Sequence, residues 1–194
     1  MDKLVIIDYD TGNVQSLKYA LNRLGVDPIL SRDAEQIRSA EKVILPGVGA
    51  ARPAMEALSS YGLDKLVSEL KQPVMGVCLG TQIMCNYSEE GHTECLGIFD
   101  LPVLKFEEKE KVPHMGWNAI ENIDNQLFRN LEEGSFTYFV HSYYVPESDF
   151  TIARTNYMIP FSAAIGRDNF YACQFHPEKS GDVGSKILEN FMEL

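Results

Sequence analysis

A short apolar run over residues 73–77 ends at a cysteine between two glycines, and a helical pattern begins directly after it. Residues 76–80 read Gly-Val-Cys-Leu-Gly, the Gly-x-nucleophile-x-Gly pattern of a sharp strand-to-helix turn, with Cys in the place of Ser. Glycines suit such a turn because they lack the Cβ that would crowd the backbone. The turn would lift the Cys78 thiol clear of the sheet edge, and the helix dipole would favour its thiolate. A buried structural cysteine in an α/β turn is the alternative interpretation of this segment taken alone.

A histidine and a glutamate near the C-terminus supply the partners that a catalytic thiol needs. His176 and Glu178 follow the apolar stretch 170–173, and Pro177 between them stiffens the link. A nucleophilic cysteine needs a base, and the base needs an acceptor that fixes its tautomer. By itself, a His-Pro-Glu segment could be a surface turn. Together with the cysteine turn about a hundred residues upstream, it predicts a triad of Cys78, His176 and Glu178.

A loop of glycine and proline follows the strand-like run 42–45. Residues 46–49 read Pro-Gly-Val-Gly and can hold backbone N–H groups outward at the strand end. Acyl transfer needs such donors where the oxyanion forms. We expect them to come from Gly47, Val48 and Gly49, together with the N–H of Leu79, which directly follows the nucleophile. Taken alone, the Pro-Gly-Val-Gly motif could equally be an ordinary loop.

Strand-like and helix-like segments alternate through the first half of the chain. Short runs that are apolar on both faces, as in parallel strands covered by helices, are residues 4–7, 42–45 and 73–77. Helical patterns are expected at residues 14–24, 53–60, 63–70, 81–86 and 183–192. From about Gly97 to Ala164 the pattern changes to short alternating runs, including 136–140 and 151–154, which we interpret as antiparallel strands. The pattern therefore predicts an α/β fold with a mostly parallel central sheet and an antiparallel region in the second half.

Length and charge restrict the class of protein. At 194 residues the chain suits one domain, residues 1–194, with a full core. The net charge of −11 argues against nucleic acid as a partner, because phosphate binding needs a basic surface. We expect no signal peptide and no membrane span, since no apolar run approaches the ~20 residues that a span needs. The four cysteines are widely spaced and form no zinc pairs, which fits a reduced, cytoplasmic protein.

The cysteine turn, the His-Pro-Glu segment and the Pro-Gly-Val-Gly loop resemble the class I (triad-type) glutamine amidotransferases over nearly the whole chain. Finer marks are similar to one branch of that family, the glutaminase subunits of imidazole glycerol phosphate synthase. The most specific mark is Pro-His-Met-Gly-Trp-Asn at residues 113–118; the others are Ile-Asp-Tyr at 7–9 with Gly-Asn at 12–13, the 46–49 loop, and Tyr-Phe-Val-His-Ser-Tyr at 138–143. The chain departs from the branch at Ala51, where Phe is more usual, and at residues 171–173. Neither departure carries chemistry.

The resemblance implies a three-layer fold and a glutaminase that hydrolyses glutamine through a thioester on Cys78. It implies that the head group of glutamine is held by Gln82, Ser142 and Tyr143, with Gly49 near the amide. It further implies a heterodimer with a cyclase subunit built as a (β/α)8 barrel, which would receive the ammonia for histidine biosynthesis. Allosteric coupling of the two subunits is part of that expectation, and no metal or organic cofactor is implied. Three residues beside the motifs are expected either to face the partner or to serve as core and solvent-exposed positions: Trp117, Tyr138 and Lys179.

Three alternatives belong to other functions. An amidotransferase of the same class that serves anthranilate or GMP synthesis would more often carry Pro-Gly-Gly-Pro at the 46–49 loop. A cysteine peptidase or a chaperone-like α/β protein offers no reason for the arrangement of residues 174–178. A catalytically silent binding subunit is disfavoured because Cys78, His176 and Glu178 are all intact.

Overall fold

The computed structural model describes residues 3–10, 14–107 and 111–194. Within this part of the chain the centre is a seven-stranded sheet in the order β11-β12-β13-β4-β3-β1-β2. The strands are β1 (Leu4–Ile7), β2 (Ile29–Ser31), β3 (Lys42–Leu45), β4 (Val74–Val77), β11 (Thr151–Tyr157), β12 (Ile159–Arg167) and β13 (Phe170–Cys173). Strands β2, β1, β3, β4 and β13 run parallel, and β12 and β11 add an antiparallel edge.

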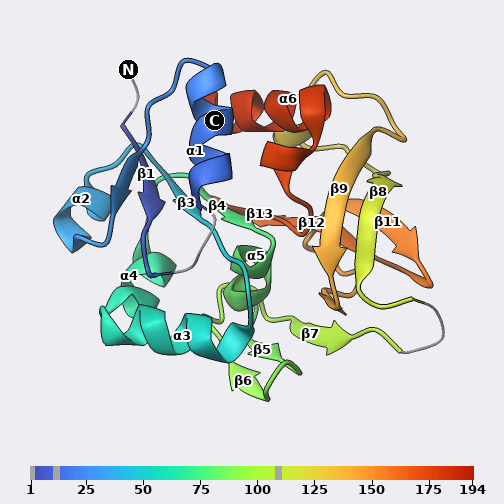
Figure 1. The fold of residues 1–194 in the computed structure, drawn as a ribbon, viewed down its shortest axis with the longest axis horizontal. Helices are drawn as coiled ribbons and strands as arrows, with labels where there is room; N and C mark the ends of the chain where they lie inside the picture. The colour runs from blue at the N-terminus through green and yellow to red at the C-terminus, as the bar shows by residue number, and fades with distance from the viewer. Residues whose placement is uncertain (1–2, 11–13, 108–110) are drawn as a thin grey trace.

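Helices cover both faces of the sheet (Figure 1). They are α1 (Val14–Arg23), α2 (Ala34–Arg38), α3 (Ala51–Ser60), α4 (Leu63–Glu69), α5 (Leu79–Met84) and α6 (Gly181–Met192). Alternate residues of β1 face opposite sides: Val5 belongs to the core cluster that includes α3, α4 and α5, whereas Leu4 packs with α1 and α6. No helix of the described residues is both long enough and apolar enough to cross a membrane.

Two smaller sheets lie beside the main sheet: one is antiparallel, and the other is mixed. A hairpin of β8 (His114–Ala119) and β9 (Phe136–His141) stands at one side of the molecule (Figure 1). A four-stranded sheet combines β10 (Tyr143–Tyr144), β7 (Pro102–Lys105), β5 (Tyr87–Ser88) and β6 (Thr93–Glu94). It is mixed because β5 pairs with β7 in parallel. Two 3-10 turns, η1 (Gln126–Phe128) and η2 (Pro177–Lys179), complete the described elements.

The predicted α/β class and its mostly parallel, helix-flanked sheet are confirmed, and so are the antiparallel pairs β8–β9 and β11–β12. The helix expected at 81–86 begins earlier, at Leu79, and ends at Met84. Strand β2 and helix α2 were not predicted. Strand β2 lies at the sheet edge with Ile29 and Leu30 about 40% exposed, so it lacks the two-sided apolar pattern of a central strand. The glycine and asparagine at 12–13 lie outside the described residues.

The turn between β4 and α5 is crowded by backbone, as the glycine pattern predicts. A Cβ built on Gly80 would overlap the carbonyl oxygen of Leu45 at the end of β3. A Cβ on Gly76 would lie 2.9 Å from Met84 Sδ and 3.0 Å from the carbonyl carbon of Gly80. The first residues of α5 therefore rest directly on the ends of β3 and β4, with no room for a side chain between them.

Gly80→Ala is expected to destabilise the protein by roughly 3 kcal/mol or more, because the contact at the new Cβ is backbone and cannot rotate away. Gly134→Ala is the matched control: Gly134 has φ +80° and open space around its Cβ position. It should lose only about 1–2 kcal/mol through the left-handed backbone. Urea unfolding of both variants measures the difference, and equal losses would show that the approach of α5 to β3 is not tight.

Candidate active site

Cys78 lies at the turn between β4 and α5, in a backbone conformation that residues other than glycine rarely adopt. Its φ is 54° and its ψ is −108°, outside the ordinary helical and extended regions. The surrounding structure enforces this, since the Cys78 N–H donates to the carbonyl of Cys173 in β13 at 2.8 Å. Such strain persists where the fold over-determines it and is typical of functional sites. The side chain is oriented toward the carbonyl oxygen of Val140, 3.9 Å from Sγ.

His176 and Glu178 form a buried pair directly after β13. The His176 N–H donates to the carbonyl of Tyr138, which anchors the segment to β9. Nδ1 of His176 lies 2.8 Å from Oε1 of Glu178, and the two side chains are 3% and 4% exposed. With Nδ1 donating to Glu178, Nε2 is the nitrogen left to interact with Cys78, whose side chain raises the pKa of His176. The three predicted triad residues are thus brought together in the order nucleophile, base and orienting acceptor.

The surroundings of His176 favour its charged form. Burial lowers its pKa, but the hydrogen bonds and charges of Cys78 and Glu178 outweigh burial and raise the pKa to about 9. An imidazolium beside Cys78 is the arrangement that stabilises a thiolate.

The remaining cysteines lie in surroundings unsuited to nucleophilic chemistry. Burial raises the pKa of both the Cys85 and the Cys173 thiol, and neither side chain is exposed. Burial, together with Glu94 and Glu90, raises the pKa of Cys95 to about 12. Of the four cysteines, Cys78 is therefore the one equipped with a base.

A cavity of about 340 Å³ opens over the thiol. Most of the predicted site residues line it, from four separate segments: Val48, Gly49, Cys78, Leu79, Gln82, Ser142, Tyr143 and His176. Two do not. Glu178 lies behind His176, and Gly47 packs beneath the loop, where its Cβ position meets Gly80 N at 2.8 Å.

Sequence reasoning missed Glu90 and His141, which also line the cavity. Glu90 follows strand β5, and its Oε2 accepts the Ala51 N–H at the start of α3, at 2.8 Å. No spacing in the sequence links Glu90 to the cysteine turn. A carboxylate close after the nucleophile's helix was the one available signal.

In this structure the expected oxyanion loop presents the Gly47 carbonyl to the N–H of Leu79. The Leu79 N–H donates to the carbonyl of Gly47 at 3.4 Å. Behind the loop, the hydroxyl of the fully buried Tyr9 donates to the carbonyl of Pro46 at 2.5 Å. The N–H predicted to stabilise an oxyanion is therefore occupied by the loop itself.

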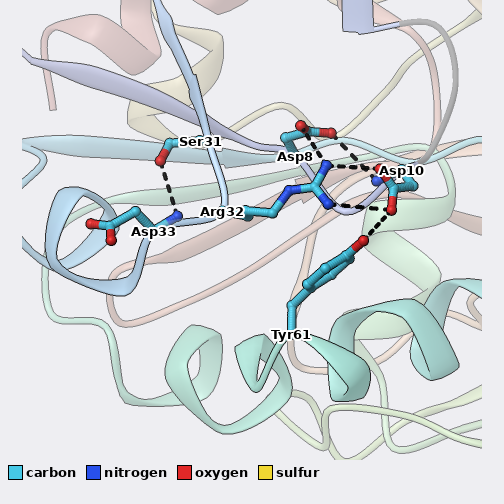
Figure 2. A network of polar contacts seen from close by, with 6 residues as sticks. All are labelled: Asp8, Asp10, Ser31, Arg32, Asp33 and Tyr61. Carbon is cyan, nitrogen blue, oxygen red and sulfur yellow. Dashed lines mark hydrogen bonds and ion pairs between the residues drawn. The ribbon is translucent and has the colours of Figure 1, made fainter.

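A charged network fixes the strand end that carries Tyr9 (Figure 2). The Arg32 guanidinium lies 2.8 Å from Asp8 and 2.7 Å from Asp10, and 4.4 Å above the ring of Tyr61. Tyr61 also donates to Asp10, whose φ is +63°. The hydrogen bonds from Arg32 and Tyr61 lower the pKa of Asp10. Because these groups are partly exposed, the network contributes little to stability, but it ties β1 to β2 and to the α3–α4 corner on both sides of Tyr9.

The geometry predicts that His176 remains protonated at neutral pH and titrates near pH 9, which NMR of histidine-labelled protein measures directly. Glu178→Gln and Cys78→Ala should each lower this pKa, because each removes a group that stabilises the imidazolium. Glu189→Gln, a carboxylate change on the exposed side of α6, should leave it unchanged. A wild-type His176 that titrates at or below pH 6.5 would contradict the paired site.

Known proteins give an independent comparison. The family model described as glutamine amidotransferase class-I matches residues 5–194. The imidazole glycerol phosphate synthase subunit HisH of Bacteroides fragilis (strain YCH46) is 53% identical over 99% of this chain and 100% of its own length. The subunit of the same name from Pectobacterium atrosepticum is 45% identical over 99% of this chain and 100% of its own length.

Solved structures agree on the fold. A crystal structure of a Thermoplasma acidophilum protein described as a GMP synthase subunit matches with a TM-score of 0.76 at 20% identity, over 100% of this chain and 94% of that one. A second, of a glutamine amidotransferase, matches with a TM-score of 0.77 at 18% identity, over 97% of each chain. At this identity the likeness concerns the fold alone. Together with the near-complete family match and the full-length relatives, it places the chain in the class-I glutamine amidotransferase family, in the branch formed by the HisH subunits.

Proposed function

We propose that this protein is the glutaminase subunit of imidazole glycerol phosphate synthase. It hydrolyses L-glutamine to glutamate and ammonia, and the ammonia passes to a cyclase subunit in histidine biosynthesis. The observation that carries the proposal is the buried pairing of His176 with Glu178 beside Cys78, at the base of a cavity of about 340 Å³. The subunits named HisH, 45–53% identical over nearly the full chain, support the choice of pathway.

The chemistry follows from the charges at the site. The Cys78 thiolate attacks the side-chain amide carbon of glutamine, and the imidazolium of His176 gives its proton to the departing ammonia. A glutamyl thioester remains on Cys78. The neutral His176 then takes a proton from water, which attacks the thioester and releases glutamate. Glu178 holds the Nδ1–H of His176 throughout and stabilises each imidazolium that forms.

The oxyanion site requires a change in the 46–49 loop. A carbonyl of Gly47 on the Leu79 N–H opposes the charge that develops on the amide oxygen. Rotation of the peptide that joins Gly47 and Val48 would turn this carbonyl away and offer the Val48 N–H beside that of Leu79. Each such donor contributes on the order of ~3 kcal/mol to stabilising the transition state. We infer that the structure represents a latent state, which the partner converts to an active one.

The four residues that we propose hold the amino-acid end of glutamine all line the cavity: Gln82, Glu90, Ser142 and Tyr143. The amide nitrogen of Gln82 is already used, since it donates to the carbonyl of Tyr143 and to Gln174 Oε1, both at 3.1 Å. Its oxygen is therefore the atom suited to the substrate's ammonium group. The Glu90 carboxylate adds the opposite charge that an ammonium group needs.

The hairpin β8–β9 is the surface best suited to the cyclase. It carries three large apolar side chains that are more than half exposed: Met115, Trp117 and Phe136. Lys179, on the rim of the cavity, lies 5.9 Å above the ring of Tyr138 on the same hairpin. An exposed aromatic group beside a catalytic opening is typical of an interface. We propose that a (β/α)8-barrel cyclase covers this face as a cytoplasmic heterodimer.

A glutamine analogue that carries a chloroketone should label Cys78 alone among the four cysteines, read by mass spectrometry of peptides. Cys78→Ala should abolish glutaminase activity and leave folding and partner binding intact. Glu178→Gln should lower turnover less than His176→Ala, since Glu178 orients while His176 carries the proton. Labelling at Cys85 or Cys173, or a reversed order of the two losses in folded variants, would contradict the assignment.

The latent state predicts a distinct effect of Gly49→Ala. Gly49 has φ +95° and open space around its Cβ position, so alanine strains the present loop conformation without a clash. Because Gly49 lies in the loop that rotates, the ratio of partner-activated to basal glutaminase activity should change several-fold, with little change in glutamine affinity. Gly47→Ala is unsuited to this test, because its Cβ would meet Gly80 N and Leu79 Cβ within 3 Å.

The matched control is Gly134→Ala, which strains a left-handed glycine remote from the cavity. It should leave the activation ratio unchanged. An isolated wild-type chain that hydrolyses glutamine as fast as the liganded complex would rule out the latent state.

A further inference from the structure

Two histidines that take no part in the triad face each other across the β8–β9 hairpin. His114 and His141 are paired in register and are 3% and 5% exposed. Nδ1 of His114 lies 2.9 Å from Nε2 of His141. Two buried imidazoles in direct contact need a defined arrangement of protons, because one nitrogen must donate and the other must accept.

Asn118 sets the direction of this arrangement. Its Oδ1 accepts the Ala119 N–H at 2.9 Å, and its Nδ2 donates to the carbonyl of Asn156 at 2.9 Å, so its amide cannot be reversed. Nδ2 also lies 3.3 Å from Nε2 of His114. An amide nitrogen is a donor only, and Nε2 of His114 must therefore accept. His114 then carries its proton on Nδ1 and donates it to His141.

The same logic fixes His141. Because its Nε2 accepts from His114, its proton sits on Nδ1, which lies 2.7 Å from the carbonyl oxygen of Tyr143. The hydrogen bonds thus run in one direction, from the Asn118 amide through both rings to the Tyr143 carbonyl. Protonating either ring would set two donors against each other, so both are neutral.

The packing around the rings agrees with neutral imidazoles. His114 is stacked between Tyr157, with ring centroids 4.1 Å apart, and Phe139, at 4.9 Å. Burial lowers the pKa of His114 to about 4. Burial lowers the pKa of His141 to about 3; the hydrogen bond to the Tyr143 carbonyl opposes this shift, and His114 and His176 add to it.

The end point of this chain of hydrogen bonds is the wall of the cavity. The Tyr143 carbonyl accepts from His141 on one side and from Gln82 Nε2 on the other, at 3.1 Å. The carbonyl of the adjacent Ser142 accepts the Phe106 N–H at 3.1 Å. The backbone of Ser142 and Tyr143 is therefore held at both carbonyls, and both residues line the cavity.

We propose that His114 is a positioning residue for the substrate wall, the part of the cavity lining formed by Ser142 and Tyr143. It holds His141 as the Nδ1–H tautomer, and His141 in turn fixes the carbonyl of Tyr143. His114 itself does not line the cavity. The proposal rests on the proposed function only in taking glutamine as the ligand of that wall. The hydrogen-bond direction is independent of the ligand.

His114→Phe tests the role in binding, because phenylalanine keeps a stacked ring and removes both nitrogens. In the complex with the cyclase subunit, we expect the KM for glutamine to rise about five- to tenfold, the effect of one lost hydrogen bond on the wall, while kcat changes less than twofold. Thr137→Val is the matched control. Thr137 is buried on the same face of β9, and its hydroxyl has no hydrogen-bond partner among the described residues. Its KM should stay within twofold of the wild type.

The second measurement is ¹⁵N NMR of the wild-type chain labelled at its four histidines. His114 and His141 should both show the neutral Nδ1–H tautomer, which free histidine disfavours, and both should keep it at pH 6. An Nε2–H tautomer at either ring, an unchanged KM in His114→Phe, or an equal rise in Thr137→Val would overturn the proposal. A wild-type complex without glutaminase activity would instead refute the proposed function and leave the tautomers to be judged by NMR.

Discussion

The contact between the start of α5 and the end of β3 is the constraint from which the site follows. Because Gly80 lies against the Leu45 carbonyl with no space for a Cβ, α5 begins directly at the sheet edge. Cys78 is then forced into its unusual backbone conformation, and the Leu79 N–H is brought to the 46–49 loop. A looser turn would separate Cys78 from the 46–49 loop. The close packing of backbone on backbone therefore determines the chemistry as well as the fold.

The buried sheet holds Cys78, His176 and Glu178 rigidly enough to keep charged groups in place. Strands β4 and β13 are adjacent and parallel, so their carboxyl ends deliver Cys78 and His176 to the same edge. The pair of His176 and Glu178 is almost fully buried, and a charge there is sustained only if each partner is fixed. Oε2 of Glu178 has no hydrogen-bond partner among the described residues. The carboxylate thus directs its bonding to His176, which strengthens the imidazolium at the cost of some stability.

The sequence predicted the parts of the fold and site that have local signals. Runs of apolar residues located β1, β3 and β4, and the glycine pattern located the nucleophile, because both depend on near neighbours in the chain. The edge strand β2 was not predicted, because its exposed residues break the two-sided apolar pattern of a central strand. Glu90 and His141 were not predicted, because only the folded chain brings them to the cavity. The orientation of the Gly47 carbonyl depends on backbone torsion angles that no residue pattern specifies.

The backbone carbonyls of Tyr143 and Gly47, both beside the active site, are held very differently. The Tyr143 carbonyl accepts two hydrogen bonds, at 2.7 and 3.1 Å, from side chains that are themselves fixed by buried partners. The Gly47 carbonyl accepts a single long bond of 3.4 Å from Leu79, and it lies in a loop whose next glycine already has a left-handed φ. Hydrogen bonds weaken with length, so turning the Gly47 carbonyl away costs less free energy than turning the Tyr143 carbonyl away. The proposed switch by a partner needs this contrast: one carbonyl would move to open the oxyanion site, while the other would keep the substrate in place.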